Sequence, residues 1–465
     1  MHLSEEVFCP ASSERELGSS RYLSSLVHRI GSTRFEGKDC LVVRQHLLDA
    51  IAAAFLGCRE KPFADLARLC PRTAAGCGWP GSGPERVDPV DAAMLWSFAI
   101  HASVFEDGSR EGACHPAAVV VPAAIAFSEG KSWETVDKAL VAGYDVMVRL
   151  ARSGNPAFTR RGFHPTAIVA PFGAAATASL LLGHDLPATQ NALCLAAMGC
   201  AGLMTSFRCG ETQPLQVAWS VRSGLAAAMM AGAGHGGYPM ILEEGFYPAY
   251  LGDHPRLPLD KPLHYEYAVQ GSYLKPYPGC RHLHPSIDAL AEILAAVRLS
   301  PDRVDRVNVR TYRIAVETEI HELARRGDAY FNIPYAIAAR LVLGRSDWDA
   351  FDPRHFADES LMALMKKVSV QADPELDSLY PHQRGSIVEV YTVDGSMHAA
   401  RVKFPLGEPE NPLSDSFIRD KFRRAAGAFL SKEDLDRLET VLQVSGRLDP
   451  PKSLFDIACR NLQPR

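Results

Sequence analysis

The spacing of apolar residues changes twice along the chain, and this limits the folds open to it. In the first half these residues recur at helical spacing, as over 42–55. Over 304–314 they alternate, which is typical of a strand, and 386–404 has the pattern of a hairpin around Asp394-Gly395. Helical spacing returns after residue 412. The pattern predicts a mainly α protein with an inserted α+β segment.

The length of 465 residues favours two domains, because single hydrophobic cores stop growing well below this size. A Pro-rich stretch at Leu257–Leu263 is expected to connect them. We expect residues 1–265 to form the first part of a large helical domain. Residues 266–406 would form a smaller α+β lid domain, and residues 407–465 would return to the helical domain.

Three stretches of the first helical part have compositions of their own. Residues 58–90 are rich in Gly, Pro and Arg, which predicts a long surface connection. Residues 189–230 are Ala, Leu, Met and Gly throughout, which predicts a helix buried on most faces. The glycines of Gly232–Gly237 follow an Ala-rich helix instead of a strand, so they indicate a helix end and a loop and not a dinucleotide site.

The overall composition excludes several classes of protein. The net charge is −5, and 47% of the residues are hydrophobic and 22% charged. This composition lacks the excess of basic residues that is typical of proteins that bind nucleic acid or a membrane surface. The eleven cysteines form no Cys-x-x-Cys pair, so reduced thiols are expected. No uninterrupted apolar run reaches about 18 residues, so no membrane span is expected. We expect a cytoplasmic protein that binds neither nucleic acid nor membrane.

The chemically densest stretch is 274–288, which combines Lys275, Arg281, His284 and further polar groups around prolines and a glycine. A helix is predicted to begin at His284-Pro285. Basic side chains around a helix N-terminus stabilise anions, so a carboxylate or phosphate ligand is expected. The alternative is a basic surface loop whose histidines cap the helix.

Further histidines stand at the ends of predicted helices. His101 closes the helical pattern of 91–105 and is followed by Glu106-Asp107. His115 and His164 each precede a proline and an apolar helix. Such histidines act as helix caps or as groups that exchange protons near neutral pH.

These motifs resemble the MmgE/PrpD family, which includes 2-methylcitrate dehydratases, cis-aconitate decarboxylases and iminodisuccinate epimerase. The resemblance rests on Lys275-Pro276-Tyr277-Pro278, on Cys114-His115-Pro116, on Gly162-Phe163-His164-Pro165-Thr166 and on Ala329–Ala338, and it runs in order from about residue 20 to 430. It implies an all-α domain built from both chain ends, an inserted α+β lid, an active site between them and a homodimer.

The resemblance also implies roles for individual residues. Protons would be exchanged by His115 and His164, Lys275 would stabilise enolate charge or shuttle a proton, and Tyr335 would donate to the leaving hydroxyl. The substrate would be held by Arg222, Gln213, Arg281, His284, His101 and Asp107.

Two positions depart from the family pattern. Val104 stands where family members commonly have an aspartate, and Gln213 stands where they usually have a lysine. A glutamine can form hydrogen bonds but carries no charge and transfers no proton. Both departures weaken the expectation that decarboxylase chemistry is retained unchanged.

The sequence therefore predicts a lyase that works without a cofactor and dehydrates a citrate-like polycarboxylate such as 2-methylcitrate or an alkylcitrate. The alternatives are decarboxylation of a cis-aconitate-type acid, epimerisation next to a carboxylate, and a catalytically silent binding protein. No metal is expected, because His282-x-His284 lacks the further ligands and spacing of a zinc site.

Overall fold

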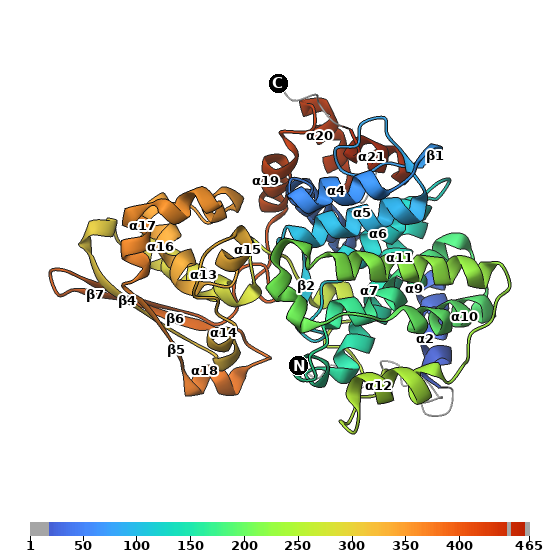
Figure 1. Cartoon of the computed structure of the whole chain (residues 1–465), viewed down its shortest axis with the longest axis horizontal. Coiled ribbons are helices and arrows are strands. Elements are labelled where there is room, and N and C mark those ends of the chain that lie inside the picture. Colours follow the sequence, from blue (N-terminus) through green and yellow to red (C-terminus); the bar gives the residue numbers. More distant parts are fainter. Residues whose placement is uncertain (1–17, 444–447, 461–465) are drawn as a thin grey trace.

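The computed structural model describes residues 18–443 and 448–460, and it shows a mostly helical chain with a small mixed sheet. Figure 1 shows two lobes. The larger, called here the helical lobe, contains residues 18–257, 415–443 and 448–460; the smaller, called the mixed lobe, contains residues 284–402. The first 17 residues lie outside the described residues.

The centre of the helical lobe is the buried helix α9, which packs against α7 and α11. Small residues permit this close packing: a Cβ on Gly224 of α11 would lie 2.3 Å from the carbonyl oxygen of Pro171 in α9. The helices of this lobe before residue 257 are α2 (Ser19–Ser32), α3 (Gly37–Gly57), α4 (Lys61–Leu69), α5 (Pro89–Ala102), α6 (Ala117–Phe127), α7 (Trp133–Gly154), α8 (Ala157–Arg160), α9 (Pro165–Leu182), α10 (Leu186–Ala196), α11 (Leu215–Gly232) and α12 (Tyr247–Leu251).

Two of these helices, α3 and α9, are long and apolar enough to cross a membrane by length and composition. However, 78% and 89% of their most apolar windows are buried inside the lobe. Burial among other helices accounts for the apolar character of both.

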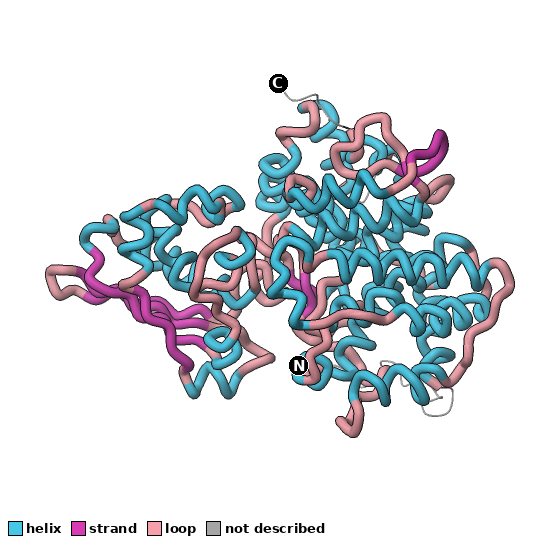
Figure 2. Tube along the Cα trace, viewed as in Figure 1, coloured by secondary structure: helices cyan, strands magenta, loops and turns pink. Residues whose placement is uncertain are grey.

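The mixed lobe contains a four-stranded sheet in the order β5-β4-β6-β7 (Figure 2). Strand β6 alternates between buried and partly exposed residues, so one face of the sheet is covered, and α13 packs against β6 and β7. The strands are β4 (Val304–Thr311), β5 (Val368–Ala372), β6 (Ser386–Thr392) and β7 (Met397–Val402), and the helices are α13 (His284–Ala296), α14 (Arg313–Glu317), α15 (Arg326–Ala329), α16 (Ile333–Leu343), α17 (Glu359–Met365) and α18 (Pro374–Leu379).

The C-terminal helices lie on the helical lobe, where α19 packs against α3 (Figure 1). The bounds of these helices are α19 (Asp415–Ala426), α20 (Lys432–Glu439) and α21 (Pro451–Ala458). The helices predicted after residue 412 were expected to run to about residue 446. Residues 444–446 of that prediction lie outside the described part of the chain.

The structure confirms the strand at 304–311, the hairpin β6–β7 and the helix that begins at His284. The surface connection predicted for 58–90 was wrong in part, because it contains α4 and the strand β1 (Arg72–Cys77). The continuous buried helix predicted for 189–230 was also wrong. It is interrupted between α10 and α11 by the 3₁₀ segment η2 (Met204–Thr212), and α11 has an exposed face.

A short pairing between β2 (Gly108–Ser109) and β3 (Ser272–Tyr273) joins segments far apart in sequence. Gly108 pairs with Tyr273, and a Cβ on Gly108 would lie 2.3 Å from the hydroxyl oxygen of Tyr273. This two-residue pairing therefore places the residues just before β2 beside those just after β3.

Candidate active site

The β2–β3 pairing brings Glu106 next to Lys275. The Glu106 Oε2 atom lies 3.9 Å from Lys275 Nζ, and each side chain is only 1% exposed. Lys275 Nζ also donates a hydrogen bond of 3.0 Å to the carbonyl oxygen of Val104. Val104 has a φ of 49°, which is unusual for a β-branched residue, and the same carbonyl accepts from the Gly279 N–H. The backbone at Val104 thus directs a carbonyl at Lys275.

Three histidines surround this pair. His101 lies at the end of α5, between His115 and His164, with ring centroids 5.6 Å and 5.7 Å from theirs. The His101 Nδ1–H donates to Glu106 Oε1 at 2.9 Å, and the Gln213 amide nitrogen lies 3.2 Å from His101 Nε2. The predicted residues His101, His115, His164, Gln213 and Lys275 are therefore brought together.

The tautomers of the two outer histidines differ. His115 Nδ1–H donates to the carbonyl oxygen of Asp107 at 2.6 Å, which leaves Nε2 with a lone pair. The Gln216 amide donates to His164 Nδ1 at 3.0 Å, which leaves the proton of neutral His164 on Nε2. His115 thus offers a proton acceptor, and His164 offers a hydrogen-bond donor. His115 keeps 23% of its side-chain surface exposed, so it is open to a ligand.

Burial and neighbouring charges fix the protonation states of these groups. Burial lowers the pKa of His115 to about 4, although Glu106 acts in the opposite direction. Burial also lowers the pKa of His164 well below its ordinary value, assisted by His101 and His115. Burial opposes ionisation of Glu106, but Lys275, His115 and His101 together hold its pKa below the ordinary range. At neutral pH the cluster therefore contains neutral His115 and His164 and an ionised Glu106.

Other predicted site residues have partners of their own. Asp107 accepts hydrogen bonds from His46, Tyr144 and the Ala117 N–H, and it is fully buried. Arg222 lies on the exposed face of α11, where it pairs with Asp91. The Tyr335 hydroxyl donates to the carbonyl oxygen of Ala350 at 2.7 Å.

The basic pair near the start of α13 is also engaged internally. Arg281 Nε donates to Glu408 at 3.0 Å, and Arg281 donates to the carbonyl oxygens of Pro405 and Leu406. His284 is completely buried, with its Nδ1 2.9 Å from Arg281. The structure does not direct these two side chains, or those of Asp107, Arg222 and Tyr335, into the histidine cluster.

Three residues of the cluster and its border are not among the site residues predicted from the sequence. Glu106 was noted only as part of an acidic pair, yet it contacts His101 and faces Lys275. Gln216 orients His164, and Phe207 of η2 packs edge-on against the His164 ring. The position of Gln216, three residues after Gln213 on one helical face, is the signal that could have identified it.

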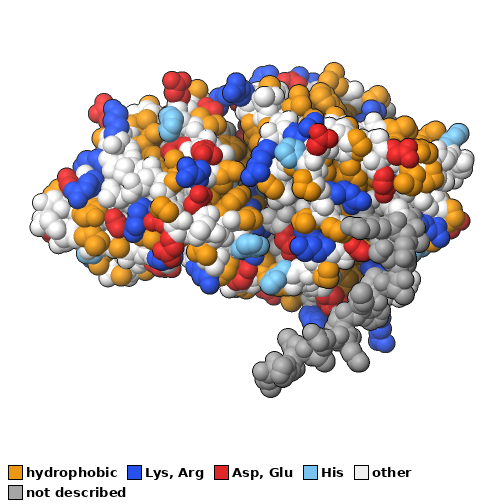
Figure 3. All heavy atoms as spheres, turned by 90° about the horizontal axis from the view of Figure 1, so that it is seen from below, with side chains coloured by type: hydrophobic (Ala, Val, Ile, Leu, Met, Phe, Trp, Pro, Cys, Tyr) orange, Lys and Arg blue, Asp and Glu red, His pale blue; other side chains and the backbone are white. Residues whose placement is uncertain are grey.

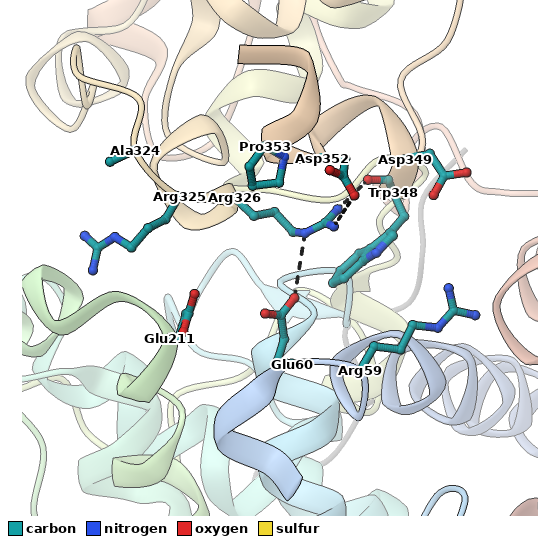
Figure 4. Close-up of a pocket in the computed structure, with 10 residues that line it drawn as sticks. All are labelled: Arg59, Glu60, Glu211, Ala324, Arg325, Arg326, Trp348, Asp349, Asp352 and Pro353. Carbon is teal, nitrogen blue, oxygen red and sulfur yellow. Dashed lines mark hydrogen bonds and ion pairs between the residues drawn. The ribbon is translucent and has the colours of Figure 1, made fainter. Parts of the chain in front are cut away.

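A cavity lies between the lobes, and Tyr330 is buried near charged residues of both lobes. Burial raises the pKa of the Tyr330 phenol. The Arg326 charge lowers this pKa, whereas the Glu60 and Glu106 charges raise it, so charged groups of both lobes act on the phenol. The cavity, of about 370 Å³, is lined by Glu60 and Glu211 from the helical lobe and by Arg325, Arg326 and Trp348 from the mixed lobe, among others (Figure 4). Arg326 bridges the lobes, 3.7 Å from Glu60 and 3.0 Å from Asp352.

No group of three or more His, Cys, Asp or Glu side chains is placed to hold a metal ion within residues 18–443 and 448–460. On the face shown in Figure 3, Lys and Arg side chains alternate with Asp and Glu, without a large area of one charge. This pattern does not resemble the basic surface that nucleic-acid binding requires.

Comparison with known proteins identifies the family of the chain. Residues 23–257 match the MmgE/PrpD N-terminal domain and residues 277–446 match the MmgE/PrpD C-terminal domain, so the chain belongs to the MmgE/PrpD family. The chain is 28% identical to a cis-aconitate decarboxylase-like protein of Aspergillus oryzae, with 76% of this chain and 79% of that protein covered.

Two further relatives carry different activities. Mouse cis-aconitate decarboxylase is 26% identical, over 86% of this chain and 85% of its own length. The 2-methylcitrate dehydratase of Cupriavidus necator is 26% identical, over 42% of this chain and 43% of its own length. The homologues are thus named as lyases, but some names denote a decarboxylase and another denotes a dehydratase.

Proposed function

We propose that the protein is a lyase that removes a proton from a carbon next to a carboxylate in a small polycarboxylic acid. The observation that carries this proposal is the arrangement of His115, whose Nδ1–H is held by the Asp107 carbonyl oxygen and whose Nε2 is unprotonated at neutral pH. A neutral, partly exposed imidazole held in one tautomer is suited to act as a base.

The neighbouring groups supply what proton abstraction from such a carbon requires. Lys275 provides positive charge inside a dry site, where charge stabilisation is strong. The Nε2–H of His164 donates a hydrogen bond to an oxygen of the substrate. We propose the dehydration of a citrate-like hydroxy acid: the C–H bond breaks with transfer of the proton to His115, and the hydroxyl on the adjacent carbon departs as water after it gains a proton.

Decarboxylation of a cis-aconitate-type acid is the second candidate. It is favoured by the names of the relatives that cover most of their own length. Gln213 weighs against it, because a neutral amide stands where the family usually has a lysine. One fewer cation means weaker binding of a tricarboxylate.

The reaction is tested by incubating chelator-treated protein with citrate, 2-methylcitrate, longer alkylcitrates and cis-aconitate in heavy water, followed by NMR. Loss of water from a hydroxy acid would support the dehydratase, and release of carbon dioxide would support the decarboxylase. Deuterium uptake without net conversion would indicate an epimerase.

Two variants separate chemistry from folding in this experiment. His115→Asn should abolish turnover, whereas His235→Asn, in an exposed loop after α11, should leave turnover unchanged. If wild-type protein is inactive on the whole panel, the protein is a silent binding member of the family or acts on another acid.

We also propose that the two lobes are domains with boundaries near residues 265 and 406, and that the protein is a cytoplasmic homodimer. The dimer proposal is supported by an exposed apolar row on α11. Trp219, Met229 and Met230 are 57%, 48% and 47% exposed, and they lie on one helical face.

A further inference from the structure

Arg384 is a buried arginine whose guanidinium group has no partner. It stands shortly before β6 in the mixed lobe and is only 5% exposed. Among residues 18–443 and 448–460, no hydrogen bond or close ion pair joins this guanidinium to another group, and its Nε atom is sealed from solvent without an acceptor. Buried charges are normally paired, because an isolated charge in the interior is costly. The terminal nitrogens of Arg384 are not sealed, so a ligand can reach them.

The positive charge of Arg384 also lacks a counterion. The Glu408 carboxylate acts on Arg384 from beyond ion-pair distance, and it already pairs with Arg281 at 3.0 Å and with Arg110 at 3.2 Å. Arg110 has a further partner in Glu410, at 2.6 Å. Three guanidinium groups therefore share two carboxylates, and Arg384 is the one without a direct partner. A site with one excess positive charge favours a singly charged anion.

Aromatic side chains and an imidazole surround the guanidinium. The Cζ atom of Arg384 lies 5.7 Å from the centroid of the Tyr273 ring, and the rings of Tyr312 and Tyr380 stack on each other nearby, with centroids 4.8 Å apart. Burial, assisted by the Arg384 charge, lowers the pKa of the partly exposed His282 to about 3, so this imidazole is neutral. When the Tyr312 hydroxyl donates to His282 Nδ1, at 2.5 Å, the proton of His282 lies on Nε2, which is then a free donor.

We infer that Arg384 binds a carboxylate group, with His282 as a second donor. A guanidinium offers two parallel N–H groups that match the two oxygens of a carboxylate, and the single negative charge balances the excess positive charge. The Cys280 thiol is influenced by both Lys275 and Arg384, so the carboxylate site lies near the candidate active site. The inference stands without the proposed lyase function, because it concerns binding alone. The carboxylate belongs either to the polycarboxylic acid of the proposed function or to a separate acid.

Acetate and acetamide test the site in wild-type protein, because they differ in charge but hardly in size. At matched ionic strength, acetate should raise the unfolding temperature more than acetamide does, since a ligand of the native state stabilises it. Arg384→Met should lose this acetate-specific shift. Arg401→Met, which removes an exposed arginine of β7 that pairs with Glu375, should keep it. Arg384→Lys, which retains the charge but lacks the planar pair of donors, should show a smaller shift.

Isothermal titration with tricarballylate identifies the source of the carboxylate. If a carboxylate of the polycarboxylic acid occupies the site, Arg384→Met should weaken tricarballylate binding by at least about 10-fold relative to wild type and Arg401→Met. If a separate acid occupies it, Arg384→Met should lose the acetate-specific shift and bind tricarballylate as wild type does.

Equal shifts with acetate and acetamide in wild-type protein would overturn the inference, and this result does not depend on the folding of any variant. An acetate-specific shift that survives unchanged in Arg384→Met would overturn it as well. The proposed function fails separately: a wild-type protein that shows the acetate-specific shift but converts none of the acids offered as substrates would refute the lyase proposal alone.

Discussion

Asp49 of α3 and Lys421 of α19 form a buried ion pair of 2.6 Å that joins the two ends of the chain. Lys421 Nζ also donates to the carbonyl oxygens of Phe105 and Lys275, at 2.8 Å and 3.0 Å. One ammonium group therefore links α19, α3 and the backbone on both sides of the candidate active site.

Lys421→Met should destabilise the protein by about 3–5 kcal/mol, because it leaves the Asp49 carboxyl, whose pKa is raised by burial, without its partner in the interior. The double variant Asp49→Leu/Lys421→Met should recover much of this loss. Lys61→Met, which breaks the exposed pair with Asp65, should cost less than about 1 kcal/mol. Denaturant unfolding measures all three variants, and a Lys421→Met protein as stable as wild type would contradict the role assigned to the pair.

The pH dependence of turnover should report the protonation of His115. Because the pKa of His115 is lowered to about 4, the imidazole is a base throughout the neutral range and is lost as a base only when the pH falls through this value. Protonation of His115 should leave kcat/KM constant between about pH 8 and pH 5 and should lower kcat/KM below about pH 4. Circular dichroism should confirm that the protein remains folded. An acidic limb near the ordinary histidine value would assign the base elsewhere.

Replacement of Gln213 by lysine should restore a cation beside His101, since the Gln213 amide is buried 3.2 Å from that ring. Gln213→Lys is expected to tighten the binding of tricarballylate by about 10-fold. The control is Gln371→Lys on the exposed strand β5, which should change binding little. Equal affinities for both variants would show that position 213 does not face the ligand.

Ala113 has a φ of 50°, a left-handed conformation that is costly for a residue with a Cβ atom. Ala113→Gly should therefore stabilise the protein by about 0.5–1 kcal/mol. The same substitution at exposed Ala64 in α4 should destabilise it by about 1 kcal/mol. Opposite signs in thermal unfolding are the expected result, and equal destabilisation would indicate that the backbone at residue 113 relaxes.

The exposed row on α11 should determine the oligomeric state. Trp219→Glu places a charge in the proposed dimer interface, so the dimer dissociation constant should rise by at least about 100-fold. Met397→Glu, at an exposed methionine of β7 in the mixed lobe, should leave the dimer intact. Analytical ultracentrifugation measures both, and a monomeric wild-type protein would refute the dimer.

The helix positions and the hairpin could be predicted because their signals are local: apolar spacing, a Pro at a helix start and Asp-Gly at a turn. The strand β5 was missed because it is short and pairs in parallel with β4, from which it is separated by a long connection. Helix α4 was missed because the Gly and Pro residues around it obscure a nine-residue pattern.

The candidate site could be predicted only in part, because loop conformation decides which of two neighbouring residues faces the cluster. Glu106 and Asp107 are adjacent carboxylates, yet the first faces Lys275 and the second accepts hydrogen bonds from His46 and Tyr144. Similarly, the pairing of Arg281 with Glu408, 127 positions later, leaves no trace in local sequence. Resemblance identified the region, and tertiary contacts selected the side chains.

The hydrogen bonds of Lys421 also bear on the biosynthesis of the protein. Phe105 and Lys275 emerge from the ribosome long before Lys421 does, so their carbonyl groups await a donor that is synthesised near the end of the chain. The helical lobe can begin to pack during translation, but the final arrangement of the backbone around Glu106 and Lys275 forms only after α19 has left the ribosome. A chain that ends before α19 would therefore lack the donor for these two carbonyl groups, however well its first 400 residues had folded.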